Sequence, residues 1–148
     1  VVTTAGSDEA RSRLESLGAD TVLDYRDDSL AESVRAVGQP DVVVDHRLDD
    51  YLALDVEVAA QGARIVTIFG DPTDDASSAI ARRKELTLQW MAVSNAPDLP
   101  AALNRVADLV ADGRLEVVVD QTFDLAAAAE AQAALEASDR FGKLVVVP

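Results

Sequence analysis

The chain has 148 residues, 49% of them hydrophobic, which suits one main globular unit with its own core. It contains no cysteine, so these residues build no disulfide, thiolate nucleophile or thiolate–zinc site. Its formal net charge of -14 argues against nucleic acid as a partner, because phosphate backbones bind basic surfaces. No apolar run approaches the roughly 20 residues of a membrane span, and the start lacks a signal-peptide pattern. We therefore expect a soluble cytoplasmic protein without a membrane partner.

Five short apolar or β-branched runs are separated by stretches that carry helical periodicity or turn residues. They are VVTT (1–4), TVLDY (21–25), DVVVD (41–45), ARIVTIFG (63–70) and LTLQW (86–90). This alternation predicts an α/β fold with a parallel sheet. DVVVD and ARIVTIFG are nearly continuous apolar runs, so both are expected to be central strands that are buried on both faces.

The segments between these runs carry helix signals. The first expected helix extends from Asp8 to Leu17, with Ser7 as its N-cap and Gly18 as its stop. Residues 70–78 are a polar turn cluster. Further helices are expected at residues 29–37, at residues 52–60 and from Pro97–Pro100 to about Ala111.

After Asp112-Gly113 the pattern changes. LEVVVDQTFDL (115–125) predicts a strand, AAAAEAQAALEAS (126–138) a helix and GKLVVVP (142–148) a last strand. Because alanine is the best helix former, the alanine-rich run is interpreted as a close-packed helix and not as low-complexity sequence.

Three of these features together, in unbroken order, resemble the second half of the medium-chain dehydrogenase/reductases. They are LGAD (17–20) followed by a strand ending in Tyr25-Arg26, the strand of QGARIVTIFG (61–70) and the terminal FGKLVVVP (141–148). The chain is most similar to the zinc-independent quinone reductases of the zeta-crystallin type. That resemblance implies a two-domain enzyme, with a Rossmann domain that holds NADPH and a separate catalytic domain.

The resemblance also implies a domain organisation. The fold would be a Rossmann-like doubly wound parallel sheet that lacks its first strand, since no such strand or glycine-rich loop precedes Val1 in this sequence. Residues 1–112 would form a partial NADPH-binding domain, and residues 113–148 a strand-helix-strand segment that belongs to the catalytic domain. The missing strand lies between the second and fourth strands in the doubly wound order. We expect a fragment of a longer enzyme, a partner of another chain, or a rearranged sheet whose remaining strands close up.

The turn after the first strand predicts which nucleotide is bound. In a Rossmann site an acid at this strand end accepts the ribose 2′-hydroxyl of NAD, whereas small or basic residues admit the 2′-phosphate of NADP. Here Ser7 stands in a turn without an acid, which favours NADPH. The family often has a lysine where this chain has Ala10, and Arg11 is the candidate substitute because a guanidinium binds phosphate bidentately. The alternative for Arg11 is a solvated helix face.

Four other residues are candidates for the cofactor site. Tyr25 matches a family tyrosine near the adenosine phosphate, with an amphipathic edge-of-core side chain as the alternative. His46 follows DVVVD at a strand end, where doubly wound sheets bind ligands, although the sequence favours the alternative of a loop histidine beside Asp45. Phe69 and Gly70 match a pair that the family places against the nicotinamide, with a core aromatic and a turn glycine as the alternative.

The function that follows is transfer of hydride from NADPH to a quinone or an α,β-unsaturated carbonyl compound, with no catalytic residue and no metal ligand assigned in this chain. Leu86–Trp90 resembles the edge strand through which these reductases form homodimers. The alternative is a degenerate, non-catalytic Rossmann-like binding or assembly module, which Ala10 and the residues after DVVVD favour. A flavodoxin-like or response-regulator domain lacks support, because no acid cluster follows a first strand.

Overall fold

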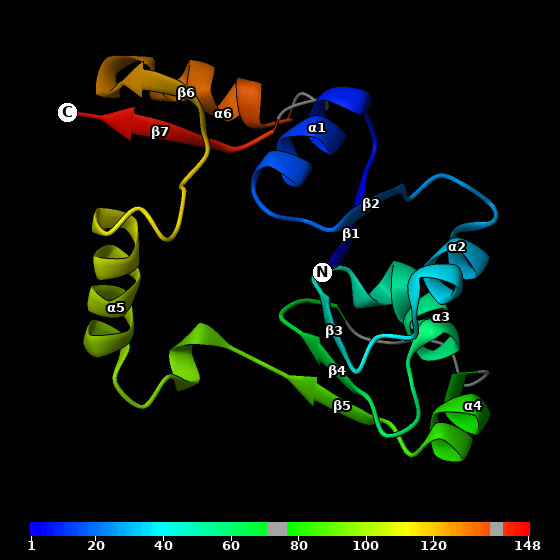
Figure 1. Cartoon of the computed structure of the whole chain (residues 1–148). Coiled ribbons are helices and arrows are strands. Elements are labelled where there is room, and N and C mark those ends of the chain that lie inside the picture. The colour runs from blue at the N-terminus through cyan, green and yellow to red at the C-terminus, as the bar shows by residue number, and fades with distance from the viewer. Residues whose placement is uncertain (71–76, 137–140) are drawn as a thin grey trace. The chain divides into compact units, whose positions relative to one another are not determined.

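A computed structural model describes residues 1–70, 77–136 and 141–148, which form an α/β fold of strands and helices (Figure 1). The chain divides into two compact units, Val1–Pro97 and Asp98–Pro148. The assignment of residues 113–148 to a catalytic domain stays a prediction, because compactness does not test it. None of the helices in the described residues is long and apolar enough to span a membrane.

The first unit alternates strands and helices in the predicted order. Its elements are β1 (Val2–Ala5), α1 (Asp8–Ser16), β2 (Thr21–Asp24), α2 (Leu30–Val37), β3 (Val42–Asp45), α3 (Leu48–Val58), β4 (Arg64–Thr67), α4 (Ser77–Lys84), β5 (Thr87–Trp90) and a 3-10 turn, η1 (Val93–Asn95). All five predicted strands are confirmed. Helix α4 was not predicted, and most of the polar turn that precedes it lies outside the described residues.

The strands form two parallel sheets in place of one. One sheet has the order β1-β2 and the other has the order β3-β4-β5. In a doubly wound sheet of order 3-2-1-4-5-6, these sheets correspond to positions 3-2 and 4-5-6. Among the described residues no strand occupies the remaining position, and β1 does not pair with β3. The two sheets are therefore separate among the described residues, and their strands do not close up.

Two clusters of buried side chains hold the first unit together. Leu30 and Val34 of α2 pack with Val58 of α3. Leu48 and Val56 of α3 pack with Ile65 of β4 in the second cluster. Helix α3 belongs to both clusters, so it links the element that follows the β1-β2 sheet to the β3-β4-β5 sheet.

The ends of α1 follow the predicted signals. The Ser7 hydroxyl accepts a hydrogen bond from the Ala10 N–H at 3.2 Å, which satisfies one of the donors left free at a helix start. Asp8 and Glu9 occupy the first turn, where the helix dipole favours negative charge. Gly18 stops the helix with φ of 101°, a conformation that favours glycine. The predicted N-cap and stop are therefore confirmed.

Two expectations about β3 and its neighbour were wrong. Helix α3 begins at Leu48 and not at Leu52, because Asp49 and Asp50 suit a helix N-terminus and Arg47 forms an ion pair with Asp50. The strand β3 is an edge strand and not a central one, since it pairs with β4 alone. Val44, on the face of β3 opposite to Val43, is 75% exposed. Strand β4 is central in its sheet, as expected.

The second unit contains α5 (Leu99–Ala111), β6 (Val119–Asp124), the 3-10 turn η2 (Leu125–Ala127), α6 (Ala128–Glu136) and β7 (Lys143–Val147). Strands β6 and β7 form a parallel pair with one register shift between Val119 and Gln121. The Asp98 side chain caps α5 by accepting a hydrogen bond from the Ala101 N–H at 2.9 Å. The predicted strand, alanine-rich helix and terminal strand are all confirmed.

Candidate functional site

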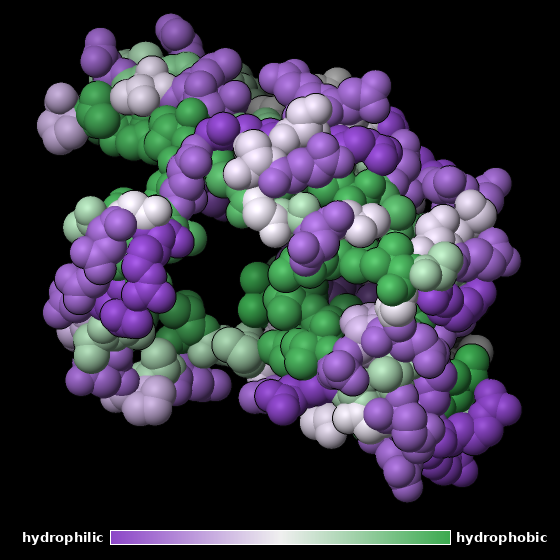
Figure 2. Space-filling model, viewed as in Figure 1, coloured by the Kyte–Doolittle hydropathy of each residue, from purple (hydrophilic) through white to green (hydrophobic). Residues whose placement is uncertain are grey.

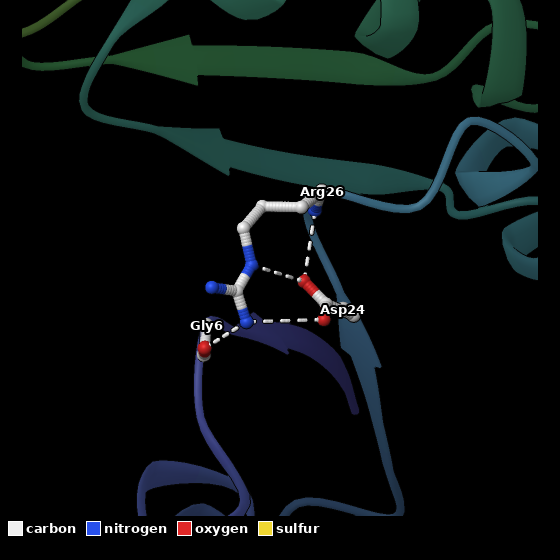
Figure 3. Close-up of polar contacts among 3 residues, drawn as sticks. All are labelled: Gly6, Asp24 and Arg26. Atoms are coloured by element: carbon white, nitrogen blue, oxygen red, sulfur yellow. Dashed lines mark hydrogen bonds and ion pairs between the residues drawn. The ribbon is translucent and has the colours of Figure 1, made fainter.

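The carboxyl ends of β1 and β2 carry a group of polar residues that surrounds the turn after β1 (Figure 3). The Arg26 guanidinium donates to the Gly6 carbonyl and to both carboxylate oxygens of Asp24, the latter at 3.1 and 3.2 Å. The Arg26 backbone N–H also donates to the Asp24 carboxylate, at 2.9 Å. These bonds hold the pKa of Asp24 below its ordinary value. A cation is therefore fixed beside the turn that selects the nucleotide in Rossmann sites.

Tyr25 completes this group. A Cβ atom at Gly6 would lie 2.6 Å from the Tyr25 hydroxyl, so the ring packs directly against the glycine. The Arg26 guanidinium carbon lies 5.7 Å from the centre of the Tyr25 ring, which is within the range of a cation–π contact. Tyr25 remains partly exposed, and the ring and the guanidinium together line the turn after β1.

The predicted phosphate residues of α1 make local contacts. The Ser7 hydroxyl caps the helix, and the Arg11 guanidinium donates to the Val22 carbonyl at 3.0 Å. The Arg11 side chain, in the first half of α1, therefore lies against β2, where one of its N–H groups is hydrogen-bonded. Arg26, which lies on the turn after β2, is the cation that contacts the turn itself.

A second group lies at the carboxyl ends of β3 and β4. His46 follows β3 and is exposed, and the side chain of Phe69 after β4 is 71% exposed. The two strand ends are linked by a hydrogen bond from the Leu48 N–H to the Phe69 carbonyl, at 3.4 Å. Gly70 has φ of 101°, and an added Cβ would lie 2.8 Å from the Asp49 carboxylate. A side chain at position 70 would therefore disturb the start of α3.

The single tryptophan of the chain joins this second group. The Trp90 indole N–H donates to the Gly70 carbonyl at 3.3 Å. Because the carboxyl ends of parallel strands share one edge of a sheet, Trp90, Phe69 and His46 all follow or end strands at that edge. The structure thus gathers the predicted residues into two groups, one on each sheet, at the edge where doubly wound folds bind ligands.

A buried pair of carboxyl groups lies behind the second group. Asp45 at the end of β3 and Asp55 on α3 are each 6% exposed. Asp45 accepts a hydrogen bond from the Arg47 N–H at 2.7 Å, but one carboxylate oxygen of each residue has no partner among the described residues. Burial, together with the charge of Asp45 and a hydrogen bond to it, raises the pKa of Asp55 to about 7. A proton on Asp55 relieves both the repulsion and the missing donor.

The comparisons with known proteins identify the family. The model of the zinc-binding dehydrogenase family matches residues 17–146. The chain belongs to this family. No curated protein sequence matches the chain. The zinc-binding dehydrogenases are oxidoreductases, so the chain is a partial domain of the medium-chain oxidoreductase type.

Solved structures agree with the family. The chain is similar to an NAD-dependent alcohol dehydrogenase, at 29% identity and a TM-score of 0.85 over 100% of this chain and 44% of that one. A putative zinc-dependent alcohol dehydrogenase from Rhizobium etli CFN 42 is 27% identical, with a TM-score of 0.84 over 100% and 46%. A quinone oxidoreductase from Pseudomonas syringae pv. Tomato DC3000 shares the fold at 24% identity, with a TM-score of 0.76 over 99% and 48%. The chain spans less than half the length of these three structures.

The family name does not assign a zinc site to these residues. The chain has one histidine and no cysteine. Within residues 1–70, 77–136 and 141–148, no group of three metal-ligating side chains occurs. A zinc ion needs about four ligands of this kind, so the residues present do not fit it.

Three residues of this chain acquire their importance only from the structure. Asp24 and Arg26 were not among the candidate site residues. Asp55 was also missed, although it stands seven residues after Leu48 and one before Val56 on the face of α3 that the core buries. An acid at an apolar position of a helix stripe is the signal that predicts a buried carboxyl group.

Proposed function

We propose that this chain is the cofactor-binding part of an NADPH-dependent oxidoreductase that reduces a quinone or an α,β-unsaturated carbonyl compound. The observation that supports NADPH is the fixed cation at the turn after β1. Arg26 contacts the Gly6 carbonyl, and no acid stands in that turn before Asp8. A guanidinium at this place favours a 2′-phosphate over a 2′-hydroxyl.

The two groups of residues fit the two ends of a dinucleotide. Ser7, Arg11, Tyr25 and Arg26 would hold the adenosine end at the β1-β2 sheet. His46, Phe69 and Gly70 would line the nicotinamide end at the β3-β4-β5 sheet. The bound cofactor supplies the hydride, and the chain positions it and excludes water from the ring.

The quinone or enone substrate is proposed from the exposed apolar side chain at the second group. Phe69 offers a flat apolar wall, which suits a conjugated acceptor lying against a nicotinamide. The chain assigns no proton donor to this step. We infer that groups outside residues 1–148 complete the substrate pocket.

We also propose that the outer edge of β5 pairs with a second copy of the chain. This strand pairs with β4 on one side, and the described residues place no strand on its other side. Trp90 and Met91 at its end are each about half exposed. Pairing across a two-fold axis would cover this edge.

The cofactor proposal is tested by quenching of Trp90 fluorescence in the complete protein. NADPH bound beside Gly70 lies close to the single indole and should quench it, whereas NADH should bind at least tenfold more weakly. In Arg26→Gln the preference for NADPH should fall by a factor of about ten to one hundred, which corresponds to a charge-assisted hydrogen bond of about 1.5–3 kcal/mol. Arg82→Gln in the last turn of α4, which leads into the start of β5, is the matched control and should leave both affinities unchanged.

Two results would contradict this proposal. Tighter binding of NADH than of NADPH would assign the chain to the NAD-dependent members of the family. An absence of binding by both nucleotides would favour the second candidate, a non-catalytic module. The observation behind that candidate is that Arg11 is engaged by the Val22 carbonyl and that Ala10 offers no charge.

A further inference from the structure

We propose that Asp45 and Asp55 form a proton-dependent switch that controls the 46–48 turn, the segment that joins β3 to α3. While the two carboxyl groups share a proton, the turn is closed against the end of β4. Without the proton, the repulsion of two buried carboxylates favours a local opening of the turn. The proposal concerns the conformation of this turn, and it does not depend on which ligand the second group binds.

The two acids come from adjacent elements and meet inside the first unit. Asp45 is the last residue of β3, and Asp55 lies within α3. Each is 6% exposed, and one oxygen of each carboxyl group has no partner among the described residues. The two side chains are hydrogen-bonded to each other. Because a carboxylate cannot donate, this bond requires a proton on one of the two groups.

The surroundings of the pair are neutral and mostly apolar. Leu48 of α3 and Ile65 of β4 belong to the buried cluster that joins this helix to the sheet. In β4 the residue beside Asp45 is Thr67, which is neutral and 0% exposed. Figure 2 shows hydrophobic residues gathered in the region of β3 and β4. A second negative charge is costly in such a place, and burial accordingly raises the pKa of Asp55 to about 7.

The basic groups on the elements around the pair are engaged elsewhere. In the 46–48 turn, Arg47 forms an ion pair with Asp50. On α4, the Lys84 ammonium donates to three backbone carbonyls at the end of α3, at 2.7–3.0 Å. On α2, Arg35 forms an ion pair with Glu57. No ion pair within the described residues includes either acid of the pair, so a proton is the cation that balances it.

The pair is connected to the 46–48 turn by hydrogen bonds. The second oxygen of the Asp45 carboxylate accepts from the Arg47 N–H at 2.7 Å. The next N–H, that of Leu48, donates to the Phe69 carbonyl at 3.4 Å and so links the turn to the end of β4. This bond is longer than an ordinary N–H···O bond and is expected to break first. A displacement of Asp45 from Asp55 therefore opens the turn before it disturbs the sheet.

The direction of the switch follows from where the proton is bound. In the open turn water reaches the pair, and Asp55 loses its proton near the ordinary value of 3.8. In the closed turn the pKa of Asp55 is about 7. Between these values opening releases one proton, so each pH unit favours opening by about a further tenfold. Asp49 and Asp50 in the first turn of α3 add negative charge beside the 46–48 turn and do not oppose this direction.

The test measures amide exchange of the isotope-labelled full chain by NMR at pH 5, 6 and 7. The rates are corrected for the direct effect of pH on exchange. We expect the protection of the Arg47 and Leu48 amides to fall by about tenfold for each pH unit. Above pH 7 the protection should level off, because the closed turn then has no proton to lose.

Urea distinguishes this local opening from unfolding of the whole unit. A local opening exposes little surface, so low concentrations of urea should hardly change the exchange of the Arg47 and Leu48 amides. The amide of Ile65, in the middle of β4, should exchange through unfolding and accelerate with urea. Its protection should also exceed that of the two turn amides at every pH.

Four variants assign the effect to the pair. Asp55→Asn keeps a donor for Asp45 without a titrating proton, so it should abolish the pH dependence of the turn amides. If this variant does not fold, Asp45→Asn replaces it and should have the same effect. Asp41→Asn, at an exposed position of the same segment, is the control and should change nothing. His46→Gln should also keep the pH dependence, although histidine is the other side chain that changes charge near neutral pH.

Three outcomes would overturn the proposal. The first is protection of the turn amides that does not change with pH, or that changes equally in the natural chain and in the asparagine variant of the pair. The second is loss of the pH dependence in His46→Gln. The third is a urea dependence of the turn amides equal to that of Ile65, which would mean that the turn opens only when the unit unfolds. No nucleotide is present, so a failed test of NADPH binding leaves this result unaffected.

Discussion

Val43 and Val44 are neighbours in β3 and have the same side chain, but their surroundings differ. Val43 packs against the cluster of Leu48, Val56 and Ile65, whereas Val44 is 75% exposed. The two side chains lie on opposite faces of the strand, and the cluster covers only the face of Val43. It teaches that an apolar run does not by itself tell which of its side chains the fold buries.

The largest expected effect on the free energy of unfolding distinguishes the buried side chain of Ile65 from the exposed side chain of Val44. Ile65→Ala on β4 removes a side chain that is 1% exposed and should lower the free energy of unfolding by about 2–5 kcal/mol. Val44→Ala should change it by about 0.5 kcal/mol or less. Urea unfolding of both variants checks this. Equal losses would break the comparison, because they would mean that Val44 is buried in solution.

A smaller effect on stability concerns Asp55, the buried acid of α3. The pKa of Asp55 is about 7 in the folded chain and near 3.8 when unfolded. At Asp55 the folded state therefore binds more protons between these values, and the contribution of this group to stability falls as the pH rises from 4 to 7. Asp55→Asn has no proton to lose, so it should reduce the loss of stability between pH 5 and pH 8 by about 2 kcal/mol.

Thermal unfolding at the two pH values measures this change. Asp49→Asn, at an exposed position of the same helix, is the control and should keep the pH dependence of the natural chain. If Asp55→Asn showed the same loss as the natural chain, the carboxyl pair would not be a buried, proton-sharing pair.

The smallest effect tests the exposed start of α1, where a hydrogen bond and not burial is at stake. Ser7→Ala removes the acceptor for the Ala10 N–H and should cost about 1 kcal/mol. Ser16→Ala at the other end of the helix removes a hydroxyl that donates to the Arg13 carbonyl at 2.7 Å and should cost less than half of that. Chemical denaturation of the two variants measures the difference, and equal costs would refute the capping role of Ser7.

Local signals in the sequence predicted much of the fold. Ser7 and Gly18 marked both ends of α1, because capping and left-handed glycines depend on a few neighbouring residues. The strands of the first unit were also found from short apolar runs. The start of α3 was misplaced because Asp49 and Asp50 were interpreted as loop residues, although acids also suit a helix N-terminus.

The rest depends on contacts between distant segments. Val44 is exposed because it lies on the face of β3 opposite to Val43, and no property of DVVVD reveals which face the helices cover. The role of Arg26 follows from its bond to the Gly6 carbonyl, twenty residues away. Ser7 and His46 were predicted from their places at strand ends, and Arg11, Tyr25, Phe69 and Gly70 from the resemblance. The part of all six in cofactor binding stays a prediction.

Amide exchange along β3 in the chain alone is the most direct test of the open strand position. The Val44 N–H faces the empty side and should exchange quickly, whereas the amides of Val43 and Asp45 face β4 and should exchange at least tenfold more slowly. This alternation would support the account. Equally slow exchange of all three amides would contradict it, because a neighbour would then already lie beside β3.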